Sequence, residues 1–491
     1  MEQFKANIMK KIQLIGLMFL IMFSSSCKKF LTVEPATVTT ADKLFASPQG
    51  YTDALAGIYI GMRKNYSPAA FLNSGGTDFM AQLWYYPAAT ATNGVNYQLA
   101  HHLYKSTEVD AALNTMFLNQ YNTILNTNTL LNALTTQNVL EERLAKCTEG
   151  EGLAIRAFVH FDLMRLFGPI PSNPGSKGYL PYVTTVDKSA YSYDSYSNYM
   201  AKLTADLDKA EQLLATYDPI SKYSPASLNR TFAAYTEYQQ QYWYWRQNRM
   251  NYYAVLGLQA RVRLWMGDKV NAARYAKMVI DAVDPNGAKK FTFGVRSNLS
   301  SRNYVFFTEH LFGLNIENFN DALVSSGSQA TQVIQQSKII SDLYQSETSD
   351  LRYALFYSIS TSYFSGNASS TKKYADLLAA TTTVPNSNVF SIPMIRLSEM
   401  YLIMMECSSL TDANTYYTAY RTAREVAPIT LTETNRQDIL IREYIKDFYA
   451  EGQIFYLYKR LGITNMMWSD HSTGEAEYVL PLPSREIGLG Q

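Results

Sequence analysis

The sequence predicts an all-α fold: a scaffold of tetratricopeptide-like helical hairpins, with long irregular loops that carry the binding face. Three observations lead to this prediction. Apolar residues recur three and four positions apart along much of the chain, two such runs are each joined to a second run by a tight turn, and long segments rich in Ser, Thr, Asn, Gly and Tyr separate the others. With 47% hydrophobic residues among 491, the chain can bury a large core.

The helical runs extend along the whole chain. Besides two helical hairpins, helices are predicted at residues 49–64, 108–135, 152–167, 196–217, 231–247 and 436–449. The longest intervening loops are predicted at residues 66–105, 169–195, 286–328 and 346–393. Because loops of this length inside a compact domain are usually functional, we expect the binding face among them.

The first predicted hairpin covers residues 251–283. Its apolar positions from Val255 to Trp265 share one helical face, and this run stops at Gly267, which Asp268 follows. Gly suits the residue after a helix and Asp suits the N-cap of the next one. One helix therefore ends and another begins within two residues.

The second predicted hairpin covers residues 393–427. Met394, Tyr401 and Met404 fall on one face of its first helix, and the turn is expected at Thr411. In both hairpins, small Ala residues occupy positions where two helices approach closely. The two units therefore look like tetratricopeptide repeats, although the strict consensus of that repeat is absent.

The N-terminal segment has the order of a secretory signal. Lysines precede a run of about ten oily residues, which is half the length that a membrane-spanning helix needs, and Ser24 to Ser26 lead to Cys27. The small residues before Cys27 resemble a bacterial lipobox, in which the cysteine becomes the lipid-bearing first residue of the mature chain. The alternative is an ordinary cleaved signal with an incidental cysteine. The predicted organisation is a lipoprotein signal peptide at 1–26 and a single domain at 27–491.

The rest of the composition gives no sign of catalysis or nucleic-acid binding. The net charge is +1 with scattered basic residues, so no nucleic-acid partner is predicted. Metal-binding and cofactor-binding motifs and nucleophile elbows are not found in the sequence, and we predict neither a cofactor nor an enzyme. Cys147 and Cys407 are expected to be free thiols. His101 and His102 are interpreted as a solvated loop pair, and His160 as a residue on the polar face of a helix.

Six segments resemble one family, in the order in which that family has them. They are "SCKKFLTVEP" at 26–35, "GEGLAIRAFVHFDLMRLFGPIP" at 150–171, "ARVRLWMGD" at 260–268, "IPMIRLSEMYLIMMEC" at 392–407, "EYIKDFYAEGQIFYLYKRLG" at 443–462 and "YVLPLPSREI" at 478–487. Together they look like the SusD/RagB nutrient-uptake lipoproteins of gram-negative bacteria. The resemblance implies four tetratricopeptide-like units with irregular loops on one side.

The resemblance also implies a function. Members of the family are lipid-anchored at the outer membrane, face the cell exterior, and cap a SusC-like TonB-dependent transporter, to which they deliver oligosaccharides or other oligomers. A binding protein is therefore expected, with Cys27 as its lipid attachment point. The alternative is a lipid-anchored helical-repeat scaffold that binds protein or peptide partners in the cell envelope.

Aromatic residues of the predicted loops are the candidate ligand contacts, since stacking against a sugar buries the apolar faces of both rings. The best candidate is the segment at 77–97. The alternative role of its aromatic residues, which we weigh equally, is to seal the loop onto the helices. A second aromatic segment, 235–253, is interpreted as a packed helix face in preference to a binding platform. The predicted ligand contacts are Asp78, Trp84, Tyr85, Tyr86 and Tyr97, with Arg302 and Tyr304 at the rim.

Overall fold

The computed structural model divides into two units, and most of its described residues lie in the second. It describes residues 40–85, 94–136, 138–187, 189–229, 238, 240–316, 332–360, 367–374 and 391–486. The first unit, Met1–Ala46, contains the short helix α2 (Ala41–Leu44). All other elements belong to the second unit, Ser47–Gln491. The predicted signal peptide and Cys27 lie outside the described residues.

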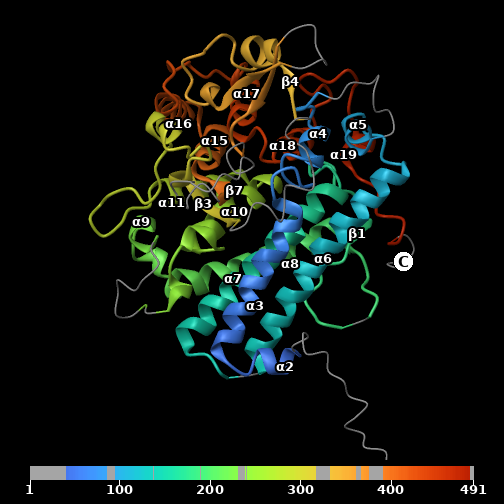
Figure 1. The fold of residues 1–491 in the computed structure, drawn as a ribbon, viewed down its shortest axis with the longest axis vertical. Helices are drawn as coiled ribbons and strands as arrows, with labels where there is room; N and C mark the ends of the chain where they lie inside the picture. Colours follow the sequence, from blue (N-terminus) through green and yellow to red (C-terminus); the bar gives the residue numbers. More distant parts are fainter. Residues whose placement is uncertain are drawn as a thin grey trace, which may run out of the picture. The chain divides into compact units, whose positions relative to one another are not determined.

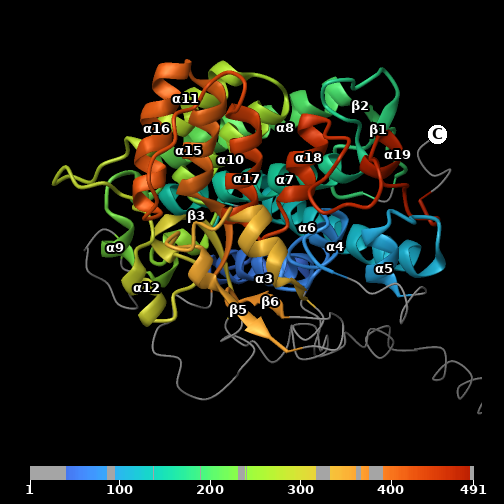
Figure 2. The same ribbon diagram turned by 90° about the horizontal axis from the view of Figure 1, so that it is seen from above.

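Four helix pairs form the scaffold of the second unit (Figures 1 and 2). The pairs are α3 (Pro48–Tyr66) with α6 (Thr107–Thr136), α7 (Glu142–Phe167) with α8 (Tyr196–Tyr217), α10 (Tyr252–Trp265) with α11 (Lys269–Ile280), and α15 (Leu397–Cys407) with α16 (Leu410–Ala423). Each pair packs against the next through the contacts of α6 with α7, α8 with α10, and α11 with α15. The predicted all-α fold of helical hairpins is confirmed. None of the described helices is both long enough and apolar enough to span a membrane.

The turn inside the third pair has the predicted capping. Gly267 adopts the left-handed conformation with φ 80°, and the Asp268 side chain accepts a hydrogen bond from the backbone N–H of Asn271. In the fourth pair the cap is Ser409, two residues before the predicted turn at Thr411, because the Ser409 side chain accepts from the N–H of Asp412.

Two further helices complete the scaffold. Helix α17 (Arg436–Phe448) packs against α15, and α18 (Ile454–Leu461) packs against α17 and the short helix α4 (Gly76–Met80). The predicted boundaries of α3, α6, α8 and α17 agree with the structure within two residues. Helix α7 starts ten residues earlier than predicted, because its first turns are polar and lack an apolar face that the sequence pattern could show.

The prediction of a helix at residues 231–247 is wrong for residues 240–247, which the structure describes. This segment forms two 3₁₀ turns, η3 (Gln241–Trp243) and η4 (Arg246–Asn248), separated by Trp245 in the left-handed conformation with φ 54°. A bulky residue at positive φ interrupts a helix. Tyr242 and Trp243 are nevertheless buried, so these aromatic residues do pack as interpreted.

Short strands occur where the sequence predicts loops or helix. Strands β3 (His310–Asn315) and β7 (Ser391–Arg396) pair antiparallel, and a second sheet has the order β4-β6-β5. Met394 lies in β7 and not in the predicted helix, which starts at Leu397. All residues of β7 are buried, so its sequence lacks the alternation that would identify a strand. The remaining strands are β1 (Gly178–Leu180), β2 (Asp194–Ser195), β4 (Ile334–Gln335), β5 (Phe356–Ile359) and β6 (Ala368–Thr371).

The connections contain several short helical turns. Figure 2 shows β5 and β6 on one side of the helices, with α11 and α16 on the opposite side. The short helices are α5 (Val95–Ala100), α9 (Pro225–Leu228), α12 (Arg296–Ser300) and α19 (Glu475–Tyr478), and the other helical turns are η2 (Pro219–Ser221), η5 (Phe307–Glu309), η8 (Lys338–Leu343) and η9 (Tyr353–Leu355).

A buried ionic cluster joins β7 to α16 and α17. Arg424 of the α16 C-terminus lies 2.7 Å from Glu309 and 2.8 Å from Asp447, and Arg396 at the end of β7 contacts the same two carboxylates. Arg352 lies 3.0 Å from Asp447. All five side chains are at most 2% exposed. Because an unpaired buried charge is very unfavourable, these pairs fix the relative position of the elements that hold them.

Candidate functional site

The predicted contact Trp84 lies in the interior. It is 3% exposed, its indole Nε1 donates a hydrogen bond to the Ser74 carbonyl at 2.9 Å, and its ring meets Tyr449 edge-on at 4.9 Å. Of the two roles weighed for this residue, the structure supports the sealing of the loop onto the helices. In this conformation Trp84 has no exposed face on which a sugar could stack.

The predicted contact Asp78 is also buried. Its Oδ1 accepts a hydrogen bond from the backbone N–H of Gly452 at 3.1 Å. Burial raises the pKa of Asp78 well above its usual value, and Glu451 adds to this effect. Asp78 therefore connects α4 to the segment after α17, and it does not present a hydrogen-bonding group at the surface.

The other predicted contacts are not brought together. Tyr85 is half-buried beside β4, where its N–H donates to the carbonyl of Val333 at 2.8 Å. Tyr97 of α5 stacks on His101 with 4.1 Å between ring centroids. Tyr304 packs against a small hydrophobic cluster of Phe306, Leu351 and Leu355, and Arg302 is exposed. These two residues follow α12, which Figure 2 shows at the opposite end of the molecule from α5. Tyr86 lies outside the described residues.

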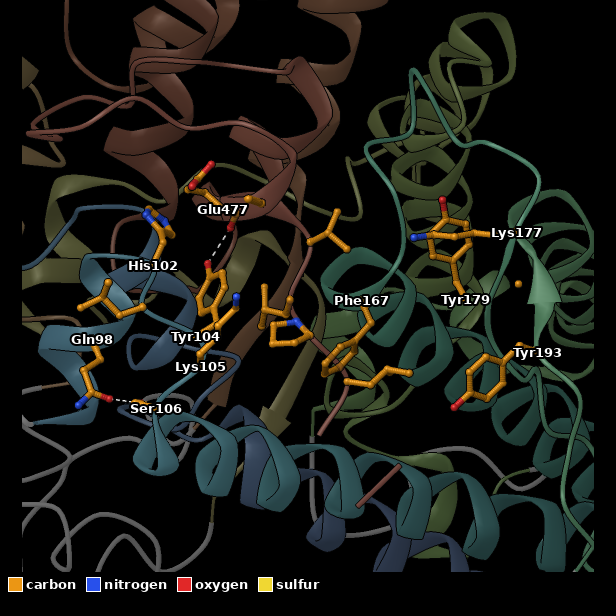
Figure 3. Close-up of a pocket in the computed structure, with 17 residues that line it drawn as sticks. Gln98, His102, Tyr104, Lys105, Ser106, Phe167, Lys177, Tyr179, Tyr193 and Glu477 are labelled. Atoms are coloured by element: carbon orange, nitrogen blue, oxygen red, sulfur yellow. Dashed lines mark hydrogen bonds between the residues drawn. The ribbon is translucent and has the colours of Figure 1, made fainter. Parts of the chain in front are cut away.

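A large cleft opens where the chain leaves α5 (Figure 3). This aromatic cleft has a volume of about 740 Å³ and is lined by 17 residues from the α5–α6 connection, the end of α7, the β1 and β2 region, and the segment after α19. Figure 3 shows Tyr104 and Phe167 on one side of Tyr179 and Tyr193, with Lys177 over the Tyr179 ring. The Tyr104 hydroxyl donates to the Glu477 carbonyl at 2.7 Å, which fixes its ring.

A histidine pair borders the aromatic cleft. His102 Nδ1 lies 2.7 Å from His471 Nε2, and His102 Nε2 lies 3.0 Å from the Met80 carbonyl. Burial and the neighbouring His471 lower the pKa of His102 to about 4. His102 is therefore a neutral, half-buried residue of the turn after α5, and it is less solvated than the interpretation as a solvated loop residue assumed.

His160 also differs from its interpretation, because it is fully buried on α7. Its Nε2 accepts from the N–H of Val183 at 3.0 Å, and burial lowers its pKa to about 3. Cys147 and Cys407 are free thiols, as expected. Within the described parts of the chain, no group of three or more His, Cys, Asp and Glu side chains could hold a metal ion.

A second cleft, the α3 cleft, runs along the outer face of α3 and has a volume of about 610 Å³. One wall is a helical stripe of α3, and the facing wall is formed by η3, Trp245 and η4. The half-buried Trp245 keeps part of its indole accessible. The polar residues that line the α3 cleft are Gln49, Thr52, Asp53, Arg63, Gln240, Gln241, Asn248, Arg249 and Asn315.

Behind two tyrosines that line the α3 cleft lies a buried polar network. Glu151 accepts hydrogen bonds from Tyr59 at 2.9 Å and Tyr242 at 2.8 Å, and Arg246 lies 2.6 Å from it. Arg246 also pairs with Asp218 at 2.9 Å. Burial opposes the ionisation of Glu151, but Arg246 and the other partners outweigh this effect and lower its pKa. The network holds η4, and with it the wall that contains Trp245.

Comparisons with known proteins give consistent results. Residues 30–240 match the model of a SusD-like family, described as starch-binding and associating with the outer membrane. A SusD superfamily protein from Bacteroides vulgatus superposes with a TM-score of 0.67 at 17% identity, over 90% of this chain and 97% of the other. The chain has a SusD-like fold.

Other solved structures extend this result. A laminarin-binding SusD-like protein gives a TM-score of 0.65 at 16% identity, over 91% of this chain and 98% of its own. A putative sugar-binding protein from Bacteroides vulgatus gives 0.62 at 19% identity, over 90% and 96%. A search of curated proteins found no match. At these identities, the superpositions show that the SusD-like fold extends over nearly the whole chain.

Sequence reasoning missed the α3 cleft of this SusD-like chain. Its two walls are almost 180 positions apart in the sequence, so no local pattern could have brought them together. One signal was present: the dense aromatic segment at 235–253 contains Trp245. The helical interpretation placed this tryptophan on a packed face, whereas the left-handed backbone turns it toward the cleft.

Proposed function

We propose that this SusD-like chain is an outer-membrane lipoprotein that captures a nutrient oligomer, an oligosaccharide, and passes it to a SusC-like TonB-dependent transporter. The observation that carries the proposal is the SusD-like fold over nearly the whole chain, together with the family match at residues 30–240. That family is described as starch-binding and associating with the outer membrane, and one structural relative is named for binding laminarin. The proposed activity is binding and delivery, without catalysis.

The proposal includes the lipid anchor at Cys27 and an orientation toward the cell exterior, with residues 1–26 removed and 27–491 forming one domain. Mass spectrometry of the mature N-terminus tests the anchor, because a lipidated Cys27 adds the mass of acyl chains that Cys27→Ser cannot acquire. Protease treatment of intact cells tests the orientation. Digestion of the protein on intact cells supports exterior display, whereas digestion only after the outer membrane is opened contradicts it.

The central experiment measures ligand binding and transporter association with the full chain in detergent. Isothermal titration against a panel of oligosaccharides should give saturable binding with at least one member, and affinity purification should recover a TonB-dependent transporter. If no oligosaccharide binds and no transporter is recovered, the proposal is wrong. Recovery of other envelope proteins alone would instead support a scaffold that binds protein or peptide partners.

Within the predicted segment at 77–97, Tyr85 and Tyr97 keep accessible surface and remain part of the proposal as ligand contacts. Alanine substitution of either ring should weaken oligosaccharide binding while the melting temperature stays close to that of the wild type. Unchanged affinity in both variants would remove the segment at 77–97 from the binding site.

A further inference from the structure

The α3 cleft has the side-chain chemistry of a site for a hydroxyl-rich ligand. Asn248 is half-buried, and Gln240, Gln241 and Asn315 are exposed at its edges. An amide side chain both donates and accepts hydrogen bonds, which matches the double character of a sugar hydroxyl. The one tryptophan of the lining supplies a flat apolar face for the C–H side of a sugar ring. Few other ligand classes use both features at once.

Trp245 is held in place before any ligand arrives. Its φ of 54° is unfavourable for a bulky residue, and such a conformation persists only where the surrounding structure maintains it. Two hydrogen bonds do so: the Trp245 N–H donates to the Leu228 carbonyl at 2.9 Å, and the Asn248 N–H donates to the Trp245 carbonyl at 2.9 Å. The aromatic platform is therefore preorganised, which lowers the entropy cost of binding.

The cationic groups of the cleft point to an acidic ligand. Among the described residues, its lining contains the guanidinium groups of Arg63 and Arg249 and one carboxylate, Asp53, which already accepts a hydrogen bond from Gln49 at 2.7 Å. The described carboxylate paired with Arg249 is Glu151, whose Oε2 lies 3.6 Å from Arg249 Nη1. Glu151 is already occupied by Arg246, Tyr59 and Tyr242.

Arg249 therefore has hydrogen-bonding capacity that its described neighbours do not use. Its buried Nη1 is the atom that lies 3.6 Å from Glu151, and it makes no hydrogen bond to any residue that the structure describes. The Arg249 side chain is 19% exposed where it lines the cleft, and its guanidinium lies 4.6 Å from the Tyr242 ring centroid. A carboxylate is the strongest hydrogen-bond acceptor for a guanidinium, because both partners are charged. A ligand carboxylate in the cleft would pair with the exposed part of the Arg249 side chain, while Nη1 stays turned toward Glu151.

We propose that the α3 cleft binds a short oligosaccharide that contains uronate groups, with Trp245 stacked on a sugar ring and Arg249 paired with a carboxylate. This inference rests on the proposed function, because it names the class of oligomer and the place where it is held. It differs from the sequence prediction, which placed the ligand at residues 77–97.

The test is isothermal titration of the full chain in detergent with uronate oligosaccharides, such as oligogalacturonate, oligoalginate and a hyaluronan hexasaccharide. Each is paired with its carboxyl-reduced neutral counterpart. At least one uronate should bind ten times more tightly than its neutral counterpart, and raising NaCl from 50 to 500 mM should reduce this preference. Equal affinity for acidic and neutral forms would overturn the uronate assignment.

Variants test the location. Trp245→Ala should weaken uronate binding at least tenfold, and Trp468→Ala is the matched control because Trp468 is also half-buried at positive φ, 71°, but does not line the cleft. Arg249→Met should remove the preference for the acidic form, whereas Arg249→Lys should retain part of it. Melting temperatures of all variants establish that they fold.

The outcomes separate this inference from the proposed function. If oligosaccharides bind but Trp245→Ala binds like the wild type, the α3 cleft is not the site, and the capture function stands. If only an acidic peptide such as oligoglutamate binds, the saccharide assignment is wrong. If no oligosaccharide of either kind binds, the proposed function itself fails.

Discussion

The substitution Trp84→Ala distinguishes a sealing role from a binding role for the most conspicuous residue of the predicted site. The Trp84 side chain is 3% exposed, packs on Tyr449, and donates its indole N–H to the Ser74 carbonyl. Truncating a buried tryptophan typically lowers the free energy of unfolding by about 3–5 kcal/mol, which includes the cavity that remains. With an entropy of unfolding of about 2 cal/mol/K per residue, this corresponds to a melting temperature lower by about 4 °C for a unit of this size.

The assay is urea denaturation followed by tyrosine and tryptophan fluorescence, with thermal unfolding alongside. Trp84→Phe retains most of the packing but loses the hydrogen bond, so its loss of stability should be about 1–2 kcal/mol. Trp468→Ala, a half-buried residue, should lose less than Trp84→Ala. The reasoning is refuted if Trp84→Ala melts like the wild type while oligosaccharide binding is lost.

Three further predictions concern stability and reactivity. Burial opposes ionisation of Glu443, but Arg352 and its other cationic neighbours lower the pKa to about 2 from 4.5. A carboxyl group whose pKa is lower in the folded than in the unfolded protein stabilises the fold at pH values above its unfolded pKa. The free energy of unfolding of the wild type should therefore lose about 2 kcal/mol relative to that of Glu443→Gln between pH 5 and pH 3, as measured by urea titration. A difference that is independent of pH would contradict this. Gly452→Ala should be far more destabilising in the same assay than Gly462→Ala: both glycines have positive φ, but only at Gly452 would a Cβ collide with the Leu72 carbonyl and the Thr77 hydroxyl. Equal losses would show that the collision is relieved. Burial raises the pKa of the Cys407 thiol to about 12 and raises that of Cys147 further. Neither thiol should therefore react with a thiol reagent at pH 8 before the protein unfolds. Rapid labelling of the native protein would be inconsistent with this packing.

The scaffold was predictable because periodicity and capping are local signals. Helix α8 has the predicted boundaries, and the turn at Gly267 and Asp268 has the expected geometry, since each depends on residues within one or two helical turns. The strand β7 was not predictable in this way. It is buried on both faces, and the helix that follows it is also apolar, so one continuous apolar run contains both elements.

The interior polar networks were beyond sequence reasoning. Glu309, Arg396, Arg424 and Asp447 come from four separate segments, and nothing in the neighbourhood of any one of them indicates its partners. The same reason explains why the burial of Trp84 was not foreseen. Trp84 was chosen for its chemistry and its loop-like surroundings, but exposure is a property of the tertiary structure, and Tyr449 covers its ring.

The two buried networks bear differently on function. The cluster around Asp447 lies wholly inside and joins β7 to the last helix pair, so its effect is on stability. The network around Glu151 joins α3, α7, η3 and η4 beside an open cleft. Arg249, which lies 3.6 Å from Glu151, lines that cleft with a side chain that is 19% exposed. If Arg249 served stability alone, Arg249→Met would mainly lower the melting temperature and leave ligand preference unchanged. Because Glu151 keeps its hydrogen bonds from Arg246 and two tyrosines when Arg249 is removed, we expect the opposite: a small change in melting temperature and a clear loss of preference for the acidic ligand.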